Sequence, residues 1–247
     1  MSTFLRIFAV ILIFAAGPLF MAACSGLGLD KNWRTADRTS ANIAPSPGLT
    51  PEALVQVYAG RAFRWRGIFG VHSWIATKER DAPYYVVHDV IGWRGYYGES
   101  TVASYASEPD RYWYGAPPEL LAELRGEEAE RAIKRIYAAV DSYPHSNEYL
   151  VWPGPNSNTF VAHIARQVPE LKLDLPPTAI GKDYLPHAAL VGETPSNTGI
   201  QVSLVGALGV LVGLEEGVEL NLLGLTLGFD PLGPALKLPG IGRVGPK

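Results

Sequence analysis

Two side chains that are far apart in this sequence have the chemistry of a nucleophile and a base. Ser157 stands in PGPNSNTFVAHI, residues 153–164, where prolines and polar residues lead into an apolar run. A serine hydroxyl is unreactive without a base, so such a site needs a histidine. His72 is the preferred candidate, because apolar or aromatic residues flank it on an expected strand and could hold its ring rigidly. The pair would support hydrolysis or acyl transfer of an amide or ester.

Both residues also have an ordinary structural interpretation. A serine in front of an apolar helical run is commonly a helix cap, which contributes about 1 kcal/mol. A histidine on a half-buried strand is commonly hydrogen bonded to backbone groups. From these residues alone, the catalytic and the structural interpretations both stay open.

A catalytic histidine needs a third group that orients its ring. Asp89 and His88 lie on the next expected strand, and Asp89 is the residue chosen, although strand register cannot be read from the sequence. Asn156, or backbone N–H groups near Ser157, could donate hydrogen bonds to a developing oxyanion. The start of a helix would favour the same negative charge. The predicted site is therefore Ser157, His72, Asp89 and Asn156.

The elements that must position this site are a sheet and a helix. Strands are expected at residues 54–60, 67–78 and 84–93, which are rich in β-branched and aromatic residues. The polar segment KERDAP, residues 78–83, predicts a hairpin between the second and third strands. His72 and Trp74 would then share one face of their strand, with Ser73 on the other.

The stretch that carries Ser157 predicts a rigid turn followed by a helix. Its prolines force an extended or turning entry. Asn156, Ser157 and Asn158 are all good caps, and Ser157 is expected at or near the cap position. Phe160, Ile164 and Val168 recur at helical spacing, and Pro169 stops the run.

A second helical region is expected at residues 117–141. Pro117 and Pro118 suit a first helical turn, and Gly126 would divide the region into a short and a longer helix. In the longer helix one apolar stripe faces the core. It consists of Ala129, Ile133, Ile136, Tyr137 and Val140.

Residues 199–230 hold two apolar, glycine-rich runs around the segment LEEG. Each run is about fourteen residues long, too short for a transmembrane helix. Two strands joined at LEEG would make a long C-terminal hairpin. The hairpin would either be buried against the core of its own domain or form a surface that touches lipid, because large apolar patches need cover.

The N-terminus reads as a targeting segment. Arg6 precedes an apolar stretch at residues 7–22, and small residues then lead to Cys24, which is the layout of a secretory signal. The segment also resembles the bacterial lipoprotein signal, which implies acylation of Cys24; Met21 departs from the usual leucine. An uncleaved anchor helix and a simple cleaved signal remain as alternatives.

All three alternatives place the body in the cell envelope, on the extracytoplasmic (periplasmic) side, and the lipoprotein and the uncleaved anchor also hold it to the membrane. The expected organisation is a targeting segment at 1–24, a polar tether at 25–50 and a single α+β domain at 51–247.

Composition excludes several classes of protein. The 247 residues are 47% hydrophobic and 18% charged with a net charge of -3, which fits a packed body and gives no basic face for nucleic acid. A single cysteine allows no intrachain disulfide and no cysteine-rich zinc site. The five histidines show no i, i+4 pair, so no metal and no cofactor are predicted.

Six stretches along the chain carry a further resemblance: NWRTADRTSANIAPSP, GVHSWIATK, WPGPNSNTF, LPPTAIGKDYL, PSNTGIQVSLVGALG and EEGVELNLLGL. Together they resemble a bacterial family of unknown function, the one numbered 3750, and this resemblance implies no activity.

A second, local resemblance concerns VHSWIA and the later NSNTFV. They are similar to circularly permuted papain-like enzymes, which include lecithin:retinol acyltransferase-like proteins, deubiquitinating peptidases and cell-wall amidase relatives. In that group a strand histidine precedes a cysteine that opens a helix. His72 would match the histidine and Ser157 the cysteine, so a serine stands where the family has its thiol.

The expected fold is therefore α+β: an antiparallel sheet packed against a few helices, permuted papain-like, with a C-terminal glycine-rich hairpin. Two functions remain open. One is an envelope hydrolase or acyltransferase, with serine replacing cysteine, that acts on a cell-wall, lipid or peptide substrate. The other is a non-catalytic envelope lipoprotein with a binding or structural role.

Overall fold

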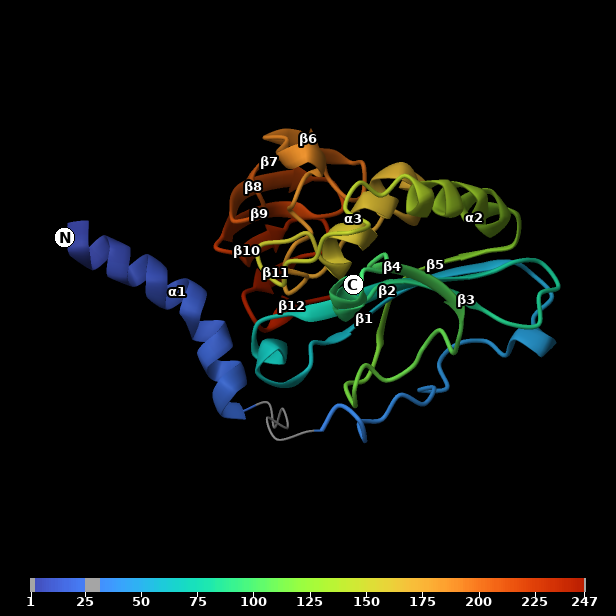
Figure 1. Cartoon of the computed structure of the whole chain (residues 1–247). Helices are drawn as coiled ribbons and strands as arrows, with labels where there is room; N and C mark the ends of the chain where they lie inside the picture. Colours follow the sequence, from blue (N-terminus) through green and yellow to red (C-terminus); the bar gives the residue numbers. More distant parts are fainter. Residues whose placement is uncertain (1–2, 25–31, 247) are drawn as a thin grey trace.

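Five antiparallel strands form the first sheet, in the spatial order β4-β3-β2-β1-β5. They are β1 (Leu54–Arg61), β2 (Val71–Lys78), β3 (Val86–Val90), β4 (Val102–Ala106) and β5 (Glu119–Arg125). The computed structural model describes residues 3–24 and 32–246 of the chain (Figure 1). The three predicted strands correspond to β1, β2 and β3, and the predicted hairpin between β2 and β3 is confirmed by the pairing of Ile75 with His88.

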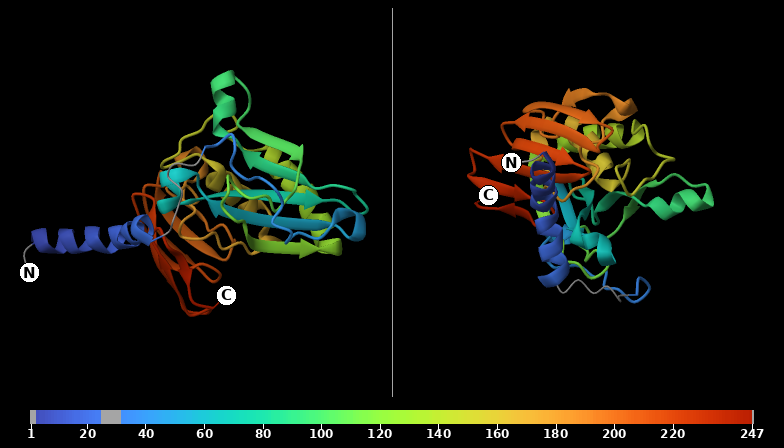
Figure 2. Two further views of the ribbon diagram at one scale, coloured as in Figure 1. Left: turned by 90° about the horizontal axis from the view of Figure 1, so that it is seen from below. Right: turned by 90° about the vertical axis from the view of Figure 1, so that its left-hand side faces the viewer.

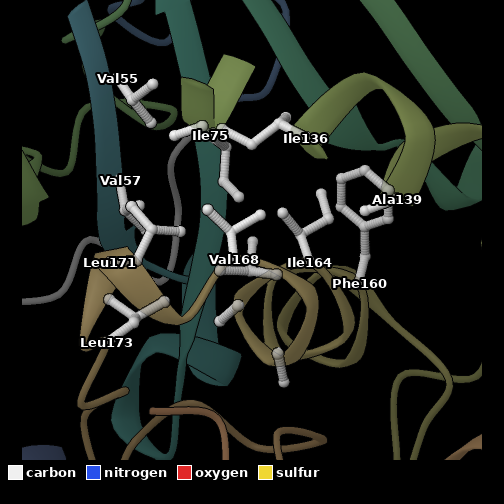
Figure 3. Packing of buried hydrophobic residues seen from close by; sticks show 14 of the residues in the cluster. Val55, Val57, Ile75, Ile136, Ala139, Phe160, Ile164, Val168, Leu171 and Leu173 are labelled. Atoms are coloured by element: carbon white, nitrogen blue, oxygen red, sulfur yellow. The ribbon is translucent and has the colours of Figure 1, made fainter. Parts of the chain in front are cut away.

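One face of the first sheet is covered by two helices, α2 (Gly126–Asp141) and α3 (Ser157–Gln167). The predicted helix faces are the ones that are buried: Ala129, Ile133 and Ile136 of α2 and Phe160 and Ile164 of α3 have at most 4% of their surface exposed. They form one core with side chains of β1 and β2, and Figure 3 shows Ile136, Phe160 and Ile164 of the helices beside Val55, Val57 and Ile75. The apolar periodicity of both helices therefore identified the core face correctly.

Residues 119–125 form a strand, and the prediction of a short helix there is wrong. This segment, β5, pairs with the outer edge of β1, from Leu54 opposite Arg125 to Ala59 opposite Glu119. Residues 54–58 of β1 are completely buried, so their backbone N–H and C=O groups on that edge need partners. Pairing with β1 satisfies these groups, and this tertiary requirement outweighs local helix propensity. Gly126, at φ +59°, marks the change from β5 to α2.

The opposite face of the first sheet carries a smaller, aromatic cluster that includes Tyr58, Trp74 and Tyr85. Irregular chain covers it. Trp74 donates to the Pro109 carbonyl at 2.7 Å, and Tyr85 donates to the Pro45 carbonyl at 2.8 Å. Residues 32–50 of the expected tether therefore include a part that is docked on the body; residues 25–31 of that tether lie outside the described residues.

The C-terminal region forms a second antiparallel sheet of seven strands in sequence order. The strands are β6 (Val191–Glu193), β7 (Gly199–Leu204), β8 (Leu208–Gly213), β9 (Gly217–Leu222), β10 (Leu225–Asp230), β11 (Ala235–Leu238) and β12 (Gly242–Val244). The predicted turn at LEEG joins β8 to β9, but the expectation of one long hairpin is wrong. Each apolar run is folded once more, at Gly206 and at Leu223–Gly224, where positive φ angles allow tight turns.

The N-terminal segment forms α1 (Thr3–Cys24), which extends from the body beside the second sheet (Figure 1). Its residue Gly17 lies directly against Pro239. Among the described residues, no helix combines the length and the apolarity needed to cross a membrane. The remaining helices are short 3-10 turns: η1 (Pro47–Leu49), η2 (Arg64–Ile68), η3 (Gly92–Tyr97), η4 (Pro169–Leu171) and η5 (Pro186–Ala188).

Candidate active site

His72 and Asp89 meet on the aromatic face of the first sheet. The His72 Nε2 atom lies 2.8 Å from Asp89 Oδ1, and both side chains are buried. His72 is on β2 and Asp89 near the end of β3, so the register of this hairpin brings the pair together. The structure thus places Asp89, the predicted orienting residue, within hydrogen-bond distance of the His72 ring.

A buried cation holds Asp89 as a carboxylate. The Nη2 atom of Arg111 donates to Asp89 Oδ2 at 2.9 Å and to the Tyr105 hydroxyl at 3.0 Å. Burial alone would raise the pKa of Asp89, but the charges of His72 and Arg111 and the hydrogen bond from His72 together lower it. An ionised Asp89 accepts hydrogen bonds only, so the proton of a neutral His72 ring is on Nε2 and its Nδ1 carries a lone pair.

Aromatic rings fix the plane of the imidazole. The ring of Trp113 stacks on His72 with a centroid distance of 3.5 Å and an interplanar angle of 5°, and Trp74 stacks on it from 5.9 Å. The Arg111 guanidinium lies over Trp74, at 5.2 Å from the ring centroid. The stacking removes rotational freedom from His72 and shields its hydrogen bond to Asp89 from water.

Ser157 is the first residue of α3, one position after the N-cap. The cap itself is Asn156, whose side-chain oxygen accepts from the backbone N–H groups of Asn158 and Thr159. The Thr159 hydroxyl accepts from the Asn156 N–H and completes a capping box. The prediction that Ser157 lies at or near the cap is therefore confirmed to within one residue.

The predicted role of the Asn156 side chain as an oxyanion donor does not fit its contacts. Its amide group donates to the carbonyls of Val151 and Ile180 at 3.2 Å and 3.0 Å, so both donors are used in holding the loop. Among the first-turn N–H groups in the described structure, that of Ser157 has no acceptor. The backbone N–H of Ser157 is therefore the better candidate for stabilising negative charge.

Asn158 links the start of α3 to β2 on both sides of His72. Its side-chain oxygen accepts from the Ser73 hydroxyl at 2.8 Å, and its amide donates to the Val71 carbonyl at 3.0 Å. Ser157, one residue earlier, is thus brought to the same end of β2 as His72, but α3 covers the face of Ser73, whereas the His72 side chain points to the opposite, aromatic face. In the described part of the chain, no hydrogen bond joins the Ser157 hydroxyl to the His72 ring.

The two side chains nevertheless keep some access to solvent. Neither Ser157 Oγ nor His72 Nδ1 has a hydrogen-bond partner in the described structure, and neither is among its fully buried, unpartnered polar atoms. In the loop before α3, burial raises the pKa of the Tyr149 hydroxyl, the positive charge of Arg66 lowers it, and the negative charge of Asp89 raises it. A shallow hollow lined by Ile91, Arg94 and residues 102–105 lies nearby, and its Tyr105 hydroxyl is 3.4 Å from Asp89.

Sequence reasoning missed Arg111, Trp113, Tyr105 and Asn158. Arg111 and Trp113 lie in the stretch DRYWYG, where a cation among aromatic residues could have suggested a stacked cluster. They come from an irregular loop, and nothing in their spacing points to a neighbour 22 residues earlier. Asn158 was recognised only as a helix-capping type.

Residues 52–184 match the model of the family described as Protein of unknown function (DUF3750). The matched part contains the first sheet, α2, α3 and the four predicted site residues, and it ends before β6. No curated protein and no solved structure matches the chain. Because the family model covers more than half of the 247 residues, the chain belongs to the DUF3750 family, whose function is not known.

Proposed function

We propose that this protein is a cell-envelope hydrolase or acyltransferase that acts on an amide or ester, with Ser157 as the nucleophile. The observation that carries the proposal is the buried pair of His72 Nε2 and Asp89 Oδ1 at 2.8 Å, which leaves Nδ1 of a rigidly stacked imidazole available as a base. The order of a strand histidine and a later helix-opening nucleophile is similar to that of permuted papain-like enzymes, which supports the same assignment.

The proposed reaction requires Ser157 Oγ and His72 Nδ1 to come within hydrogen-bond reach around the end of β2 when substrate binds. Nδ1 takes the hydroxyl proton as Oγ forms a bond to the carbonyl carbon, and the carbonyl oxygen becomes the oxyanion. The N–H of Ser157 donates to that oxyanion. His72 then returns the proton to the leaving amine or alcohol as the carbonyl re-forms. Water, or an acceptor hydroxyl or amine, releases the acyl group by the reverse sequence.

Serine in place of cysteine makes the base indispensable. A thiol with a pKa near 8.5 ionises readily beside a histidine, whereas a hydroxyl must lose its proton in the transition state. Asp89 and Arg111 support this role, since the carboxylate stabilises the imidazolium that forms and the guanidinium prevents protonation of the carboxylate.

The envelope location is part of the same proposal and rests on the N-terminal sequence. Cys24 is exposed at the end of α1, where a lipid could be attached. An enzyme held there would meet cell-wall peptide, lipid or lipoprotein substrates.

A non-catalytic binding role is the second candidate. The observation that favours it is the missing hydrogen bond between Ser157 and His72 in the described structure. A buried His72–Asp89–Arg111 cluster could then serve only to hold β2, β3 and the loop of Trp113 together.

The first experiment is labelling of the purified full chain with a fluorophosphonate, which reacts with activated serines. The wild-type protein is expected to be labelled, and Ser157→Ala and His72→Ala are expected to abolish labelling. Ser142→Ala, at the end of α2, is the matched control and should label like the wild type, because its hydroxyl bonds only the Ala139 carbonyl.

A thiol at position 157 distinguishes the catalytic from the binding function even when the serine itself is unreactive. In a Cys24→Ser background, which removes the only natural cysteine, Ser157→Cys creates a single thiol. If His72 is its base, the alkylation rate should show a thiol pKa well below about 8.5, and His72→Ala should restore the ordinary value. An unlabelled wild type together with an ordinary thiol pKa would establish the binding role instead.

A further inference from the structure

The second sheet has an apolar outer face that spans its strands from edge to edge. Directly paired residues form one continuous row across six strands: Ile200, Val212, Val218, Phe229, Leu236 and Val244. A neighbouring row contains Val191, Val202, Val210 and Leu220. The exposed fractions of these ten side chains lie between 44% and 63%, and none of them is charged. We call this surface the outer face.

The inner face of the same sheet is polar, and its ion pairs determine which face points outward. Glu219 accepts from Lys182 and Lys237, at 2.5 Å and 2.7 Å, and all three are buried. Lys237 also bonds Asp174 at 2.6 Å, and Asn221 donates to Asp183 at 2.7 Å. A register slip of one residue would expose these pairs and bury the valines, but it would leave buried charges without partners. The apolar side chains are therefore held outward by the structure itself.

The surroundings of the outer face have the composition of a membrane–water interface. Trp65 and Arg66 are exposed on η2. Arg61 of β1 links η2 to the β11–β12 turn, because it donates to the carbonyl of Gly67 and to those of Gly240 and Ile241. Trp152, half exposed, donates to the Leu223 carbonyl in the β9–β10 turn. Tryptophan and arginine beside an aliphatic surface are typical of residues at the headgroup level of a bilayer.

The apolar helix α1 lies on the same side of the molecule. It contacts β10 and η2, and it exposes large apolar side chains such as Phe8, Ile11 and Phe20. Figure 2 (right) shows α1 in front of the strands of the second sheet. In a chain that keeps α1, the outer face and this helix therefore expose apolar side chains that one lipid surface could cover together.

We propose that the outer face is a membrane-docking surface that rests on the apolar region of a lipid bilayer, with Trp65 and Trp152 at the headgroup level. Docking covers an apolar area that water would otherwise contact. The proposal does not depend on the chemistry of Ser157, because it needs neither the nucleophile nor the base. Loss of fluorophosphonate labelling would leave it unchanged.

The test uses the full chain with Cys24→Ser and one new cysteine, labelled with the environment-sensitive fluorophore NBD. The reporter position is Val210 on the outer face, and the control is Leu49 on η1, which is 86% exposed. With vesicles of phosphatidylcholine and phosphatidylglycerol, the Val210→Cys label should shift its emission to the blue. It should also be quenched by lipids that carry nitroxides on their acyl chains. The Leu49→Cys label should show neither change.

A charge on the outer face provides the second measurement. Val210→Asp leaves a half-exposed side chain in water when the protein is free, so the fold should persist, but docking would bury the carboxylate. The partition coefficient onto the same vesicles should fall about tenfold or more, whereas Leu49→Asp should leave it unchanged.

Two results would overturn the proposal. One is a Val210 label that stays in water on vesicles that have bound the protein. The other is a label already shielded without lipid, to a degree that rises with protein concentration, because this would show that a second copy covers the face.

Discussion

The imidazole of His72 is held from three directions, by the carboxylate of Asp89, the ring of Trp113 and its own strand. Each contact removes freedom from a side chain that would be mobile on a surface. A merely structural histidine could be buried without an anion, as His88 is, because its ring nitrogens bond the hydroxyls of Thr77 and Ser104. The cost of burying the Asp89–Arg111 pair is a reason to assign the cluster a chemical role.

At the residue scale, Asp89→Asn should destabilise the protein although the side chain keeps its size. The guanidinium of Arg111 would remain buried without its anion, and the free energy of unfolding is expected to fall by about 3 kcal/mol. Labelling of Ser157 should fall as well, because an amide does not stabilise an imidazolium. Urea denaturation followed by tryptophan fluorescence measures the first effect.

Two further variants check the reason for that loss. Tyr105→Phe removes the 3.4 Å contact of the hydroxyl with Asp89 and the 3.0 Å hydrogen bond from Arg111, but it leaves the ion pair intact and should lower stability by only about 1 kcal/mol. Arg111→Met added to Asp89→Asn should recover part of the stability, since no uncompensated charge remains. If Asp89→Asn alone were as stable as the wild type, the Asp89–Arg111 ion pair would contribute nothing to stability.

At the scale of elements, the site depends on how α3 is seated on the first sheet. Asn156 closes the first turn of α3, and Asn158 attaches that turn to the two residues that flank His72. The helix that opens with Ser157 is therefore positioned by side chains of its own first turn. Its apolar face then packs into the core shared with α2 (Figure 3).

The contact between β3 and α2 contains a second buried histidine. Its titration makes the free energy of unfolding depend on pH. His88 of β3 packs edge-on against Tyr137 of α2, and hydroxyls of Thr77 and Ser104 bond its two ring nitrogens. Burial lowers the pKa of His88 to about 4. The unfolded chain therefore binds a proton between pH 6.5 and 4 that the folded protein does not.

Stability from this residue is complete above pH 6.5 and is lost as the pH falls toward 4, by about 3 kcal/mol in total. His88→Gln should flatten the pH dependence of the unfolding free energy over this window. His187→Gln, at an exposed position on η5, should leave the dependence unchanged. Denaturation midpoints measured from pH 7 to pH 4.5 test this, and equal slopes in all three proteins would contradict it.

At the scale of the molecule, two sheets perform different tasks. The first sheet and its helices carry the candidate site and lie within the residues that match the family model. The second sheet presents polar residues to the body and an aliphatic surface to the outside, next to α1. The loop of Trp152 connects the two, because it borders the outer face and leads directly into Asn156.

The proposed location in the cell envelope leads to a prediction about processing and lipidation at the N-terminus. If Cys24 is lipidated, the intact mass of protein extracted from the membrane fraction should lack residues 1–23 and should carry acyl chains. Cys24→Ser should prevent both changes. A wild-type chain that still begins at Met1 with an unmodified thiol would refute lipidation, while the docking of the second sheet would remain to be judged by its own labels.

Local sequence signals determined the elements whose pattern repeats along the chain. The strands around His72 and Asp89, the helix from Ser157 to Gln167 and the apolar stripe of α2 follow from period-two and helical spacing, because each element buries one side. The choice of Asp89 followed from its place on the neighbouring strand, and the turn at LEEG followed from its polar residues.

Only the tertiary structure decided the features that depend on partners distant in sequence. Residues 119–125 became a strand because the buried edge of β1 needed hydrogen bonds, and the C-terminal runs were folded into short strands whose register is set by the ion pairs of Glu219. Arg111 and Trp113 reached His72 from a loop without periodicity. Backbone pairing and buried charge are satisfied across the whole fold, so a local pattern does not reveal which partner will satisfy them.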